Sequence, residues 1–224
     1  MHRGYDAYLA PCAFTGDIFA QAFRTSRDKC VYLCLPRVDY LLSPPGSIAG
    51  EMCDAYPVLK DKINVLYCPT FRKGRALKLD KLVSGFDFGR FNLIIKKHPL
   101  DKSDYSWAEA AGAIVDTAFS SMDWLKLCRK VVTDYSAISV EAAVLERELY
   151  ILRNDAESYS ERVGLNIDLG TESIAPFVCD TEEELIGALR REYDTEALLS
   201  FKKKYVEAPT DHCTESLCDY ILSL

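Results

Sequence analysis

Short apolar runs that alternate with helical stretches set the strongest limit on how this chain can fold. Runs such as Val31–Leu35 and Leu149–Leu152 are only a few residues long and lack polar alternation, which is typical of strands buried on both faces of a sheet. The stretches between these runs have the spacing of amphipathic helices. This alternation predicts βαβ units, and therefore an α/β fold with a parallel, Rossmann-like sheet.

The individual elements can be placed from the same pattern. Strands are predicted at Ala7–Ala10, Val31–Leu35, Asn64–Cys68, Leu93–Lys97, Ala113–Val115, Lys130–Thr133, Leu149–Leu152 and Phe177–Cys179. Helices are predicted at Thr15–Phe23, Leu77–Phe86, Met122–Cys128, Ile138–Leu145 and Thr181–Tyr193, followed by a last helix that runs to Leu224. Thr181 and Glu184 match a capping box, and Asp211 is a candidate cap for the last helix.

The length of the chain allows one substantial core and a small appendage. The chain has 224 residues, 49% of them hydrophobic, which is an ordinary globular composition. The stretch Ser43–Ser47 contains two prolines and a glycine, so it suits neither a helix nor a strand and is the candidate boundary. We therefore predict a small piece at residues 1–45 and the main domain at residues 46–224.

The cysteines and the N-terminus indicate the compartment. Nine cysteines are scattered along the chain, several of them inside apolar runs, which favours buried, reduced thiols over disulfides. No apolar run approaches the roughly 18 residues of a membrane span, and the N-terminus lacks the pattern of a secretory signal. These features predict a cytoplasmic protein.

The net charge of −7 argues against a general nucleic-acid partner. The basic residues are nevertheless concentrated, because residues 60–102 contain 11 Lys and Arg but only four Asp and Glu. Such a segment is either a solvated face or the binding surface for a compact anionic ligand.

Three loops that follow strands are the candidate binding corners. In open parallel sheets, ligands bind beyond the carboxyl ends of the strands. The loops there are Pro69–Gly74, Lys96–Pro99 and Asp134–Ser139. Two of them are basic, and the third opens a helix whose free N–H groups would suit phosphate oxygens.

His98 and Ser136 in these corners, and Glu141 in the helix that follows the third corner, are the candidate functional residues. His98 follows two lysines and precedes Pro99, so its imidazole could stabilise charge on a transferring phosphate; the alternative is a structural histidine. Ser136 is either a phosphate ligand or only a helix cap. Glu141 is either a ribose ligand or an exposed helix carboxylate. The sequence predicts no metal site, because His212, Cys213 and Cys218 do not make a zinc ligand set.

Together the corners resemble a known family. The segments VLYCPTFRKG, LIIKKHP, VVTDYSAISVEAAVL and LYILRNDAESYSERVG resemble the C-terminal nucleotide-binding domain of the CDP-glycerol glycerophosphotransferases, which build teichoic-acid and related polymers in bacteria. YDAYLAPCAFTGDIFAQAF and LPRVDYLL resemble the passage from the acceptor domain into that domain. The resemblance implies that the main domain is the C-terminal half of a GT-B glycosyltransferase fold, and that residues 1–45 are a remnant of the acceptor-side domain with the interdomain segment.

The resemblance also implies the activity and the roles of the site residues. The family transfers glycerol phosphate from CDP-glycerol to a polyol-phosphate polymer and releases CMP, at the inner face of the membrane. The resemblance implies no cofactor and does not decide whether a divalent metal accompanies the diphosphate. His98, as the catalytic residue, and Ser136 would contact the donor diphosphate, with Glu141 at the ribose. The remaining residues implied at the donor site are Thr70, Arg72, Lys97, Ala137 and Ser139.

The sequence departs from the family in one important respect. Full-length members carry an upstream Trp-His-Gly motif whose histidine resembles the catalytic base, but neither Trp107 nor Trp124 precedes His-Gly. In addition, Ala137 stands where many members have a second serine. The chain is therefore an excised or truncated domain, half of a split enzyme, or a decayed homologue. The rival functions are a GT-B enzyme that uses a nucleotide sugar and a non-catalytic interaction module.

Residues 1–45 also raise an expectation about association. If their strands belong to a sheet whose other strands are missing, an unpaired edge is exposed, and such edges associate. We therefore expect self-association, or a partner chain, through residues 1–45.

Overall fold

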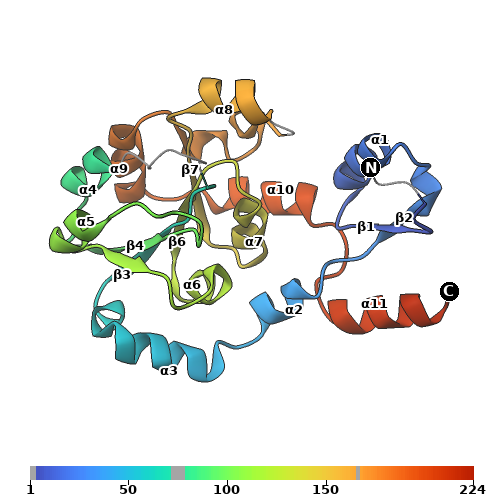
Figure 1. Ribbon diagram of the computed structural model, residues 1–224, viewed down its shortest axis with the longest axis horizontal. Coiled ribbons are helices and arrows are strands. Elements are labelled where there is room, and N and C mark those ends of the chain that lie inside the picture. The colour runs from blue at the N-terminus through green and yellow to red at the C-terminus, as the bar shows by residue number, and fades with distance from the viewer. Residues whose placement is uncertain (1–3, 72–78, 165–166) are drawn as a thin grey trace.

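A six-stranded parallel sheet forms the centre of the main body, as the sequence predicts (Figure 1). The structure is a computed structural model that describes residues 4–71, 79–164 and 167–224. The strands of the sheet are β3 (Ile63–Tyr67), β4 (Phe91–Lys96), β5 (Ile114–Asp116), β6 (Lys130–Thr133), β7 (Glu148–Leu152) and β8 (Val178–Cys179). Their order in space is β5-β4-β3-β6-β7-β8. From β3 the chain adds β4 and β5 on one side, and it then adds β6, β7 and β8 on the other side. The strand order therefore reverses between β3 and β6, and open α/β sheets bind ligands at such a switch point.

Helices cover both faces of this sheet. On one face lie α4 (Asp80–Gly85), α5 (Ser106–Ala110) and α9 (Glu182–Arg190), and on the other lie α3 (Gly46–Ala55), α6 (Ser121–Leu127), α7 (Ile138–Val144) and α10 (Thr195–Tyr205). The other helices are α1 (Ala13–Phe23), α2 (Arg37–Leu42), α8 (Ala156–Val163) and α11 (Cys213–Leu222). Among the described residues, no helix has both the length and the apolar character that crossing a membrane requires.

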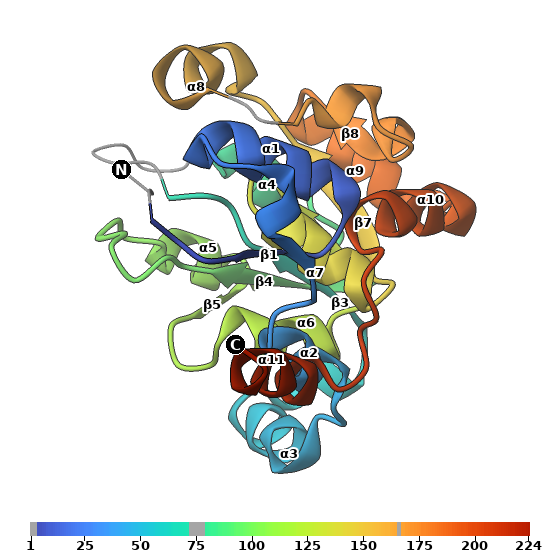
Figure 2. The same cartoon turned by 90° about the vertical axis from the view of Figure 1, so that its right-hand side faces the viewer.

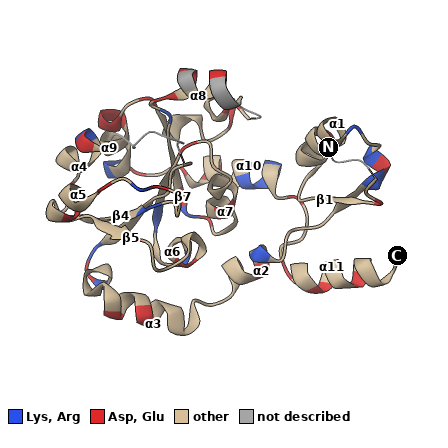
Figure 3. Cartoon of the chain, in the orientation of Figure 1, with Lys and Arg blue, Asp and Glu red and all other residues tan. Residues whose placement is uncertain are grey.

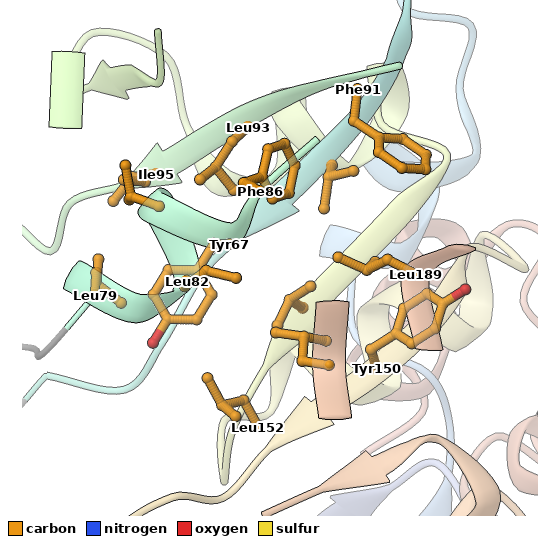
Figure 4. Close-up of a cluster of buried hydrophobic side chains, with 14 of the residues drawn as sticks. Tyr67, Leu79, Leu82, Phe86, Phe91, Leu93, Ile95, Tyr150, Leu152 and Leu189 are labelled. Carbon is orange, nitrogen blue, oxygen red and sulfur yellow. The ribbon is translucent and has the colours of Figure 1, made fainter. Parts of the chain in front are cut away.

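Alternate side chains of each strand enter two separate cores. Val65 and Tyr67 of β3 join the core that α4, α5 and α9 cover (Figure 4), whereas Leu66 joins the core on the other face with Trp124 and Phe201. A strand whose two faces are both buried must be apolar throughout. Each fully buried side chain of this size contributes about 1.5–3 kcal/mol, so the two cores together hold the sheet in place.

The first two strands form a smaller unit beside the main body (Figure 1). Strands β1 (Tyr8–Ala10) and β2 (Cys30–Tyr32) form a parallel two-stranded sheet, separate from the large one. The C-terminal part of the chain returns to this unit, since Glu207 N and Ala208 N both donate to the carbonyl of Pro11. Helix α11 then lies against α2 (Figure 2). Residues after 205 therefore contact residues 1–45, and the boundary at residue 45 stays a prediction.

Two local predictions need correction. Ser43–Ser47 contains the start of a helix as well as a break: α2 ends at Leu42, and α3 begins at Gly46, whose φ of +57° suits glycine. Asp211 does not cap α11. That role falls to Asp39 of α2, whose carboxylate accepts from Cys213 N at 2.8 Å and Thr214 N at 2.7 Å. The hydrogen bonds from Thr214 and Cys213 lower the pKa of Asp39 to about 2.

The edges of the β1–β2 pair lead to a prediction about association. In the described part of the chain these two strands pair only with each other, and Tyr32 and Leu35 beside them are exposed. We expect light scattering at high protein concentration to show a dimer or larger species, because a two-stranded sheet is marginal alone and its edges accept further strands. The variant Tyr32→Lys should reduce this association, and Leu100→Lys, on an exposed turn elsewhere, should not. A monodisperse monomer would contradict the prediction.

Candidate functional site

The loops after β3 and β6 are joined by a buried carboxylate at the point where the strand order reverses. Asp134, which directly follows β6, is only 4% exposed. Its Oδ1 accepts from Thr70 N at 2.9 Å and from Thr70 Oγ1 at 2.7 Å, and its Oδ2 accepts from Thr70 N at 3.0 Å. Thr133 Oγ1 also donates to the carbonyl of Cys68 at 2.7 Å. We call residues 68–71, 97–101 and 134–139 the switch-point corner.

The loop after β4 joins this corner through a ring contact. The imidazole of His98 stacks on Phe71, with ring centroids 4.9 Å apart and an interplanar angle of 20°. Leu100 N donates to His98 Nδ1 at 3.1 Å. A nitrogen that accepts is unprotonated, so in this geometry the ring carries its proton on Nε2. His98 is exposed, and its Nε2–H is therefore a donor suited to an anionic ligand.

The start of α7 leaves the hydroxyl of Ser136 largely uncommitted. Ala137 is the N-cap residue, and no side chain caps the helix. Within the described ranges of the chain, Ser136 Oγ accepts a long bond from Ile138 N, at 3.4 Å, and makes no other hydrogen bond. Ser139 is different, because its Oγ donates to the carbonyl of Ser136 at 2.9 Å and its side chain is buried. Of the two serines, Ser136 is thus the better placed to meet a ligand.

Glu141 has a partner that the sequence did not suggest. Its Oε1 accepts from Arg37 Nη1 of α2 at 2.9 Å, and 17% of the Glu141 side chain is exposed. The structure thus links the carboxylate proposed for the ribose to residues 1–45. A ligand that uses both oxygens of Glu141 must share this carboxylate with Arg37.

The two lysines at the end of β4 are both bound to protein groups. Lys97 Nζ donates to the carbonyl of Ser103 and lies 5.4 Å from the centroid of the Tyr105 ring. Lys96 Nζ donates to Asp116 Oδ2 at 3.1 Å. The predicted ligand Arg72 lies outside the described residues. The corner as defined therefore contains the predicted site residues Thr70, Lys97, His98, Ser136, Ala137 and Ser139, but the side chains of Lys97 and Ser139 are bound to backbone carbonyls.

Sequence reasoning missed two features of the site. One is Asp134, which opens the loop Asp134–Ser139 but was given no role from the sequence. The signal that could have identified it is a carboxylate that directly follows an apolar strand. The other is the stack of Tyr135 on Tyr159 of α8, with centroids 4.3 Å apart, which brings α8 to the corner.

The corner offers an imidazole donor and a hydroxyl, and both groups suit phosphate as a ligand. Among the described residues, no cluster of His, Cys, Asp and Glu side chains is arranged to hold a metal ion.

The strand order and this corner define a Rossmann-like domain of the GT-B type. Solved structures support this class. The wall teichoic acid polymerase TagF with CDPG superposes with a TM-score of 0.79 at 18% identity, covering 98% of this chain and 57% of that one. UDP-GlcNAc 2-epimerase from Neisseria meningitidis gives a TM-score of 0.64 at 12% identity, covering 98% of this chain and 62% of that one. At these identities the likeness shows the fold alone.

The sequence itself identifies the family. The model of the CDP-Glycerol:Poly(glycerophosphate) glycerophosphotransferase family matches residues 1–223, and the chain belongs to this family. Its curated relatives include the teichoic acid ribitol-phosphate primase of Bacillus spizizenii, 26% identical over all of this chain and 60% of the relative. The teichoic acid glycerol-phosphate primase of Staphylococcus aureus is 26% identical over 99% of this chain and 58% of the relative. The chain thus spans about 60% of the length of these relatives.

The bond from Thr70 to Asp134 leads to a prediction about stability. Replacing Thr70 with valine removes the Oγ1 donor but keeps the shape of the side chain and the backbone donor. We expect a loss of about 1.5–3 kcal/mol in the free energy of unfolding, the range for a hydrogen bond to a charged group. Thr133→Val is the matched control: its hydroxyl donates to a neutral carbonyl, so the loss should be about 1 kcal/mol. Urea unfolding measures both, and equal losses would show that the carboxylate is not the cause.

The buried carboxylate of Asp116 leads to a prediction about pH. Burial alone would raise its pKa, but hydrogen bonds from Trp124 and Lys96 outweigh burial and hold the pKa below its usual value. The stability that Asp116 contributes is therefore present above about pH 4, the ordinary range of an aspartate, and is lost as pH falls through the lowered pKa. Asp116→Asn should cost about 3–5 kcal/mol at pH 7, because it leaves Lys96 unpaired.

The pH dependence separates this effect from a simple loss of packing. Unfolding at several pH values should show that Asp116→Asn loses less stability than the parent chain between pH 5 and acid conditions, because the variant lacks the titrating group. Parallel stability curves for the two proteins would contradict the assignment.

Proposed function

We propose that the switch-point corner binds CDP-glycerol or another CDP-polyol, and that this chain supports the transfer of the polyol phosphate to a polymer hydroxyl with release of CMP. The observation that carries the proposal is the convergence of the three loops, in which Asp134 binds Thr70 and His98 stacks on Phe71. These contacts hold the His98 Nε2–H and the Ser136 hydroxyl in fixed loops, where a diphosphate could accept from both.

The same arrangement suggests how the residues would act. Phosphoryl transfer needs an in-line acceptor and donors that stabilise charge on the phosphoryl oxygens. His98 would donate from Nε2 to an oxygen of the diphosphate, and the charge that develops there would strengthen this bond in the transition state. Ser136 would donate a second bond, and Glu141 would accept from the ribose hydroxyls while Arg37 orients it.

The carboxylates of the corner are poorly suited to act as the base that deprotonates the acceptor hydroxyl. Asp134 is buried and bound to Thr70. Asp101, in the loop of His98, accepts from Ser103 N and from Tyr105 Oη. Burial would raise the pKa of Asp101, but these hydrogen bonds outweigh it and lower the pKa, which makes the carboxylate a weaker base. The base would come from the acceptor side, outside this corner.

The polyol is the part of the ligand on which the relatives differ. Both a ribitol-phosphate primase and a glycerol-phosphate primase are about equally similar to this chain. The similarity in fold to an epimerase solved with UDP-GlcNAc makes a nucleotide sugar the second candidate ligand. CDP-ribitol and a UDP-sugar therefore belong in the same binding experiment.

Calorimetric titration of the chain with CDP-glycerol, CDP-ribitol, CMP and UDP-GlcNAc tests the proposal. We expect a CDP-polyol to bind, and His98→Ala to weaken its affinity by about 10- to 100-fold, the value of a hydrogen bond to a charged group. His98→Gln should recover part of the affinity, because its amide N–H can approach the position of Nε2.

Several outcomes would contradict parts of this proposal. Unchanged affinity in His98→Ala would show that His98 does not bind the ligand. Tighter binding of UDP-GlcNAc than of any CDP-polyol would favour the nucleotide-sugar function. If no nucleotide binds, the corner is only structural and the proposed function fails.

A further inference from the structure

A second concave site lies at the opposite edge of the sheet. A cavity of about 460 Å³ opens at the amino-terminal ends of β3, β6 and β7, and its walls include Arg90, Arg129, Lys130, Glu148, Arg190 and Arg191. The switch-point corner lies at the carboxyl ends of the same strands. Five residues of strand separate the two edges of β3, which corresponds to roughly 15–20 Å. The cavity is therefore distinct from the proposed donor site.

The fold brings these cations together from separate parts of the chain. Arg90 directly precedes β4, and Arg129 directly precedes β6. Arg190 is the last residue of α9, which runs back along the sheet from the end of β8, and Arg191 follows it. The grouping thus results from the sheet topology and not from a run of charge in the sequence. It contrasts with α3 and α11, which carry acidic residues but no Lys or Arg (Figure 3).

Only part of this positive charge is neutralised within the protein. Glu148 accepts from Arg129 Nε at 2.7 Å and from Lys130 Nζ, so one carboxylate serves two cations. Within the described ranges of the chain, Arg90, Arg190 and Arg191 take part in no ion pair. In total the cavity is lined by five cationic side chains and two carboxylates, although the whole chain has a net charge of −7.

The buried member of the cluster is Lys130, which is 4% exposed and also donates to Tyr150 Oη at 2.9 Å. Burial lowers the pKa of its ammonium group; Glu148 opposes this effect, and the nearby charges of Arg129 and Arg90 lower the pKa further. Like charges held this close repel one another, and a bound anion would relieve that repulsion.

We propose that this cavity is a second phosphate-binding site, which holds a phosphodiester of a polyol-phosphate chain away from the donor corner. Guanidinium groups pair with phosphate oxygens through two parallel hydrogen bonds, and Arg190 and Arg191 are exposed at the rim. The carboxylate of Glu192 and the hydroxyl of Thr195, which also line the cavity, would accept from and donate to polyol hydroxyls. The identity of the ligand rests on the proposed function, whereas the affinity for phosphate does not.

A polyol-phosphate chain fits this site better than a membrane surface does. Surfaces that bind lipid combine basic residues with exposed apolar side chains. Of the large apolar side chains exposed in the described part of the chain, none lines this cavity. A polymer held at two sites would also bind more tightly than at either alone, because the second contact is intramolecular.

The test uses the whole chain and substitutes Arg190 and Arg191. Both are exposed, and in the described part of the chain neither takes part in an ion pair, so folding should be unaffected. Titration with a synthetic glycerol phosphate oligomer should show affinity at least about tenfold weaker for Arg190→Ala/Arg191→Ala, because two charge-assisted contacts are lost. Arg190→Lys/Arg191→Lys should be intermediate, since it keeps the charge but not the planar fork. The matched control Lys81→Ala/Lys203→Ala, which removes two cations from other surfaces, should change affinity less than about twofold.

Three further arms make the result decisive. CDP-glycerol, titrated into the same variants, should bind as it does to the parent chain; if it binds none of them while the oligomer still depends on the arginines, the proposed donor function fails and the second site stands. Inorganic phosphate should compete with the oligomer. The proposal is overturned if oligomer binding is unchanged in the alanine variant. It is also overturned if that variant loses only its sedimentation with phosphatidylglycerol vesicles, which would make the site a lipid contact.

Discussion

The contact between Asp134 and Thr70 is the interaction on which the rest of the site depends. A carboxylate that is 4% exposed is costly to bury unless its oxygens are hydrogen-bonded, and here Thr70 supplies both a backbone and a side-chain donor. This pair fixes the loop after β3 against the loop after β6. Phe71, the next residue, is thereby placed to stack on His98, so that the third loop is ordered by the first contact. A ligand would then meet donors that are already positioned.

Residues 1–45 are connected to this site by more than chain continuity. Asp39 of α2 caps α11, and Arg37, two residues earlier, binds Glu141 of α7. One short helix therefore holds the C-terminal helix with one residue and the carboxylate proposed for the ribose with another. Any movement of α2 would change the orientation of Glu141, because exposed Arg37 is the charged group that restrains it. The hydrogen bond from Arg37 to Glu141 couples α2 to the corner. A ligand that displaces Arg37 from Glu141 must offset the loss of this bond.

The sequence predicted the strands well because their signal is local. Lys130–Thr133 was predicted with its observed bounds, and the other strands lie within about three residues of theirs. The parallel order followed from the alternation of strands and helices. Contacts between distant residues could not be predicted, because no local pattern carries them: Asp39 caps a helix 174 residues away, which displaced Asp211 from that role. Glu141 shows the same limit, since its charge was visible in the sequence but its bond to Arg37, 104 residues earlier in the chain, was not.

The same hydrogen bonds that order the corner also limit its chemistry. Asp101 holds its loop by accepting hydrogen bonds as a carboxylate, and these bonds lower its pKa, so that it takes up a proton less readily. Asp134 is buried and bound to Thr70. The groups that build the site are therefore unsuited to deprotonate an acceptor hydroxyl. General base catalysis contributes about 10²- to 10⁴-fold to such reactions, or roughly 3–5 kcal/mol of the barrier. In the proposed function, binding of the donor and activation of the acceptor would thus fall to different groups, because the carboxylates that tie the loops together are already engaged as hydrogen-bond acceptors.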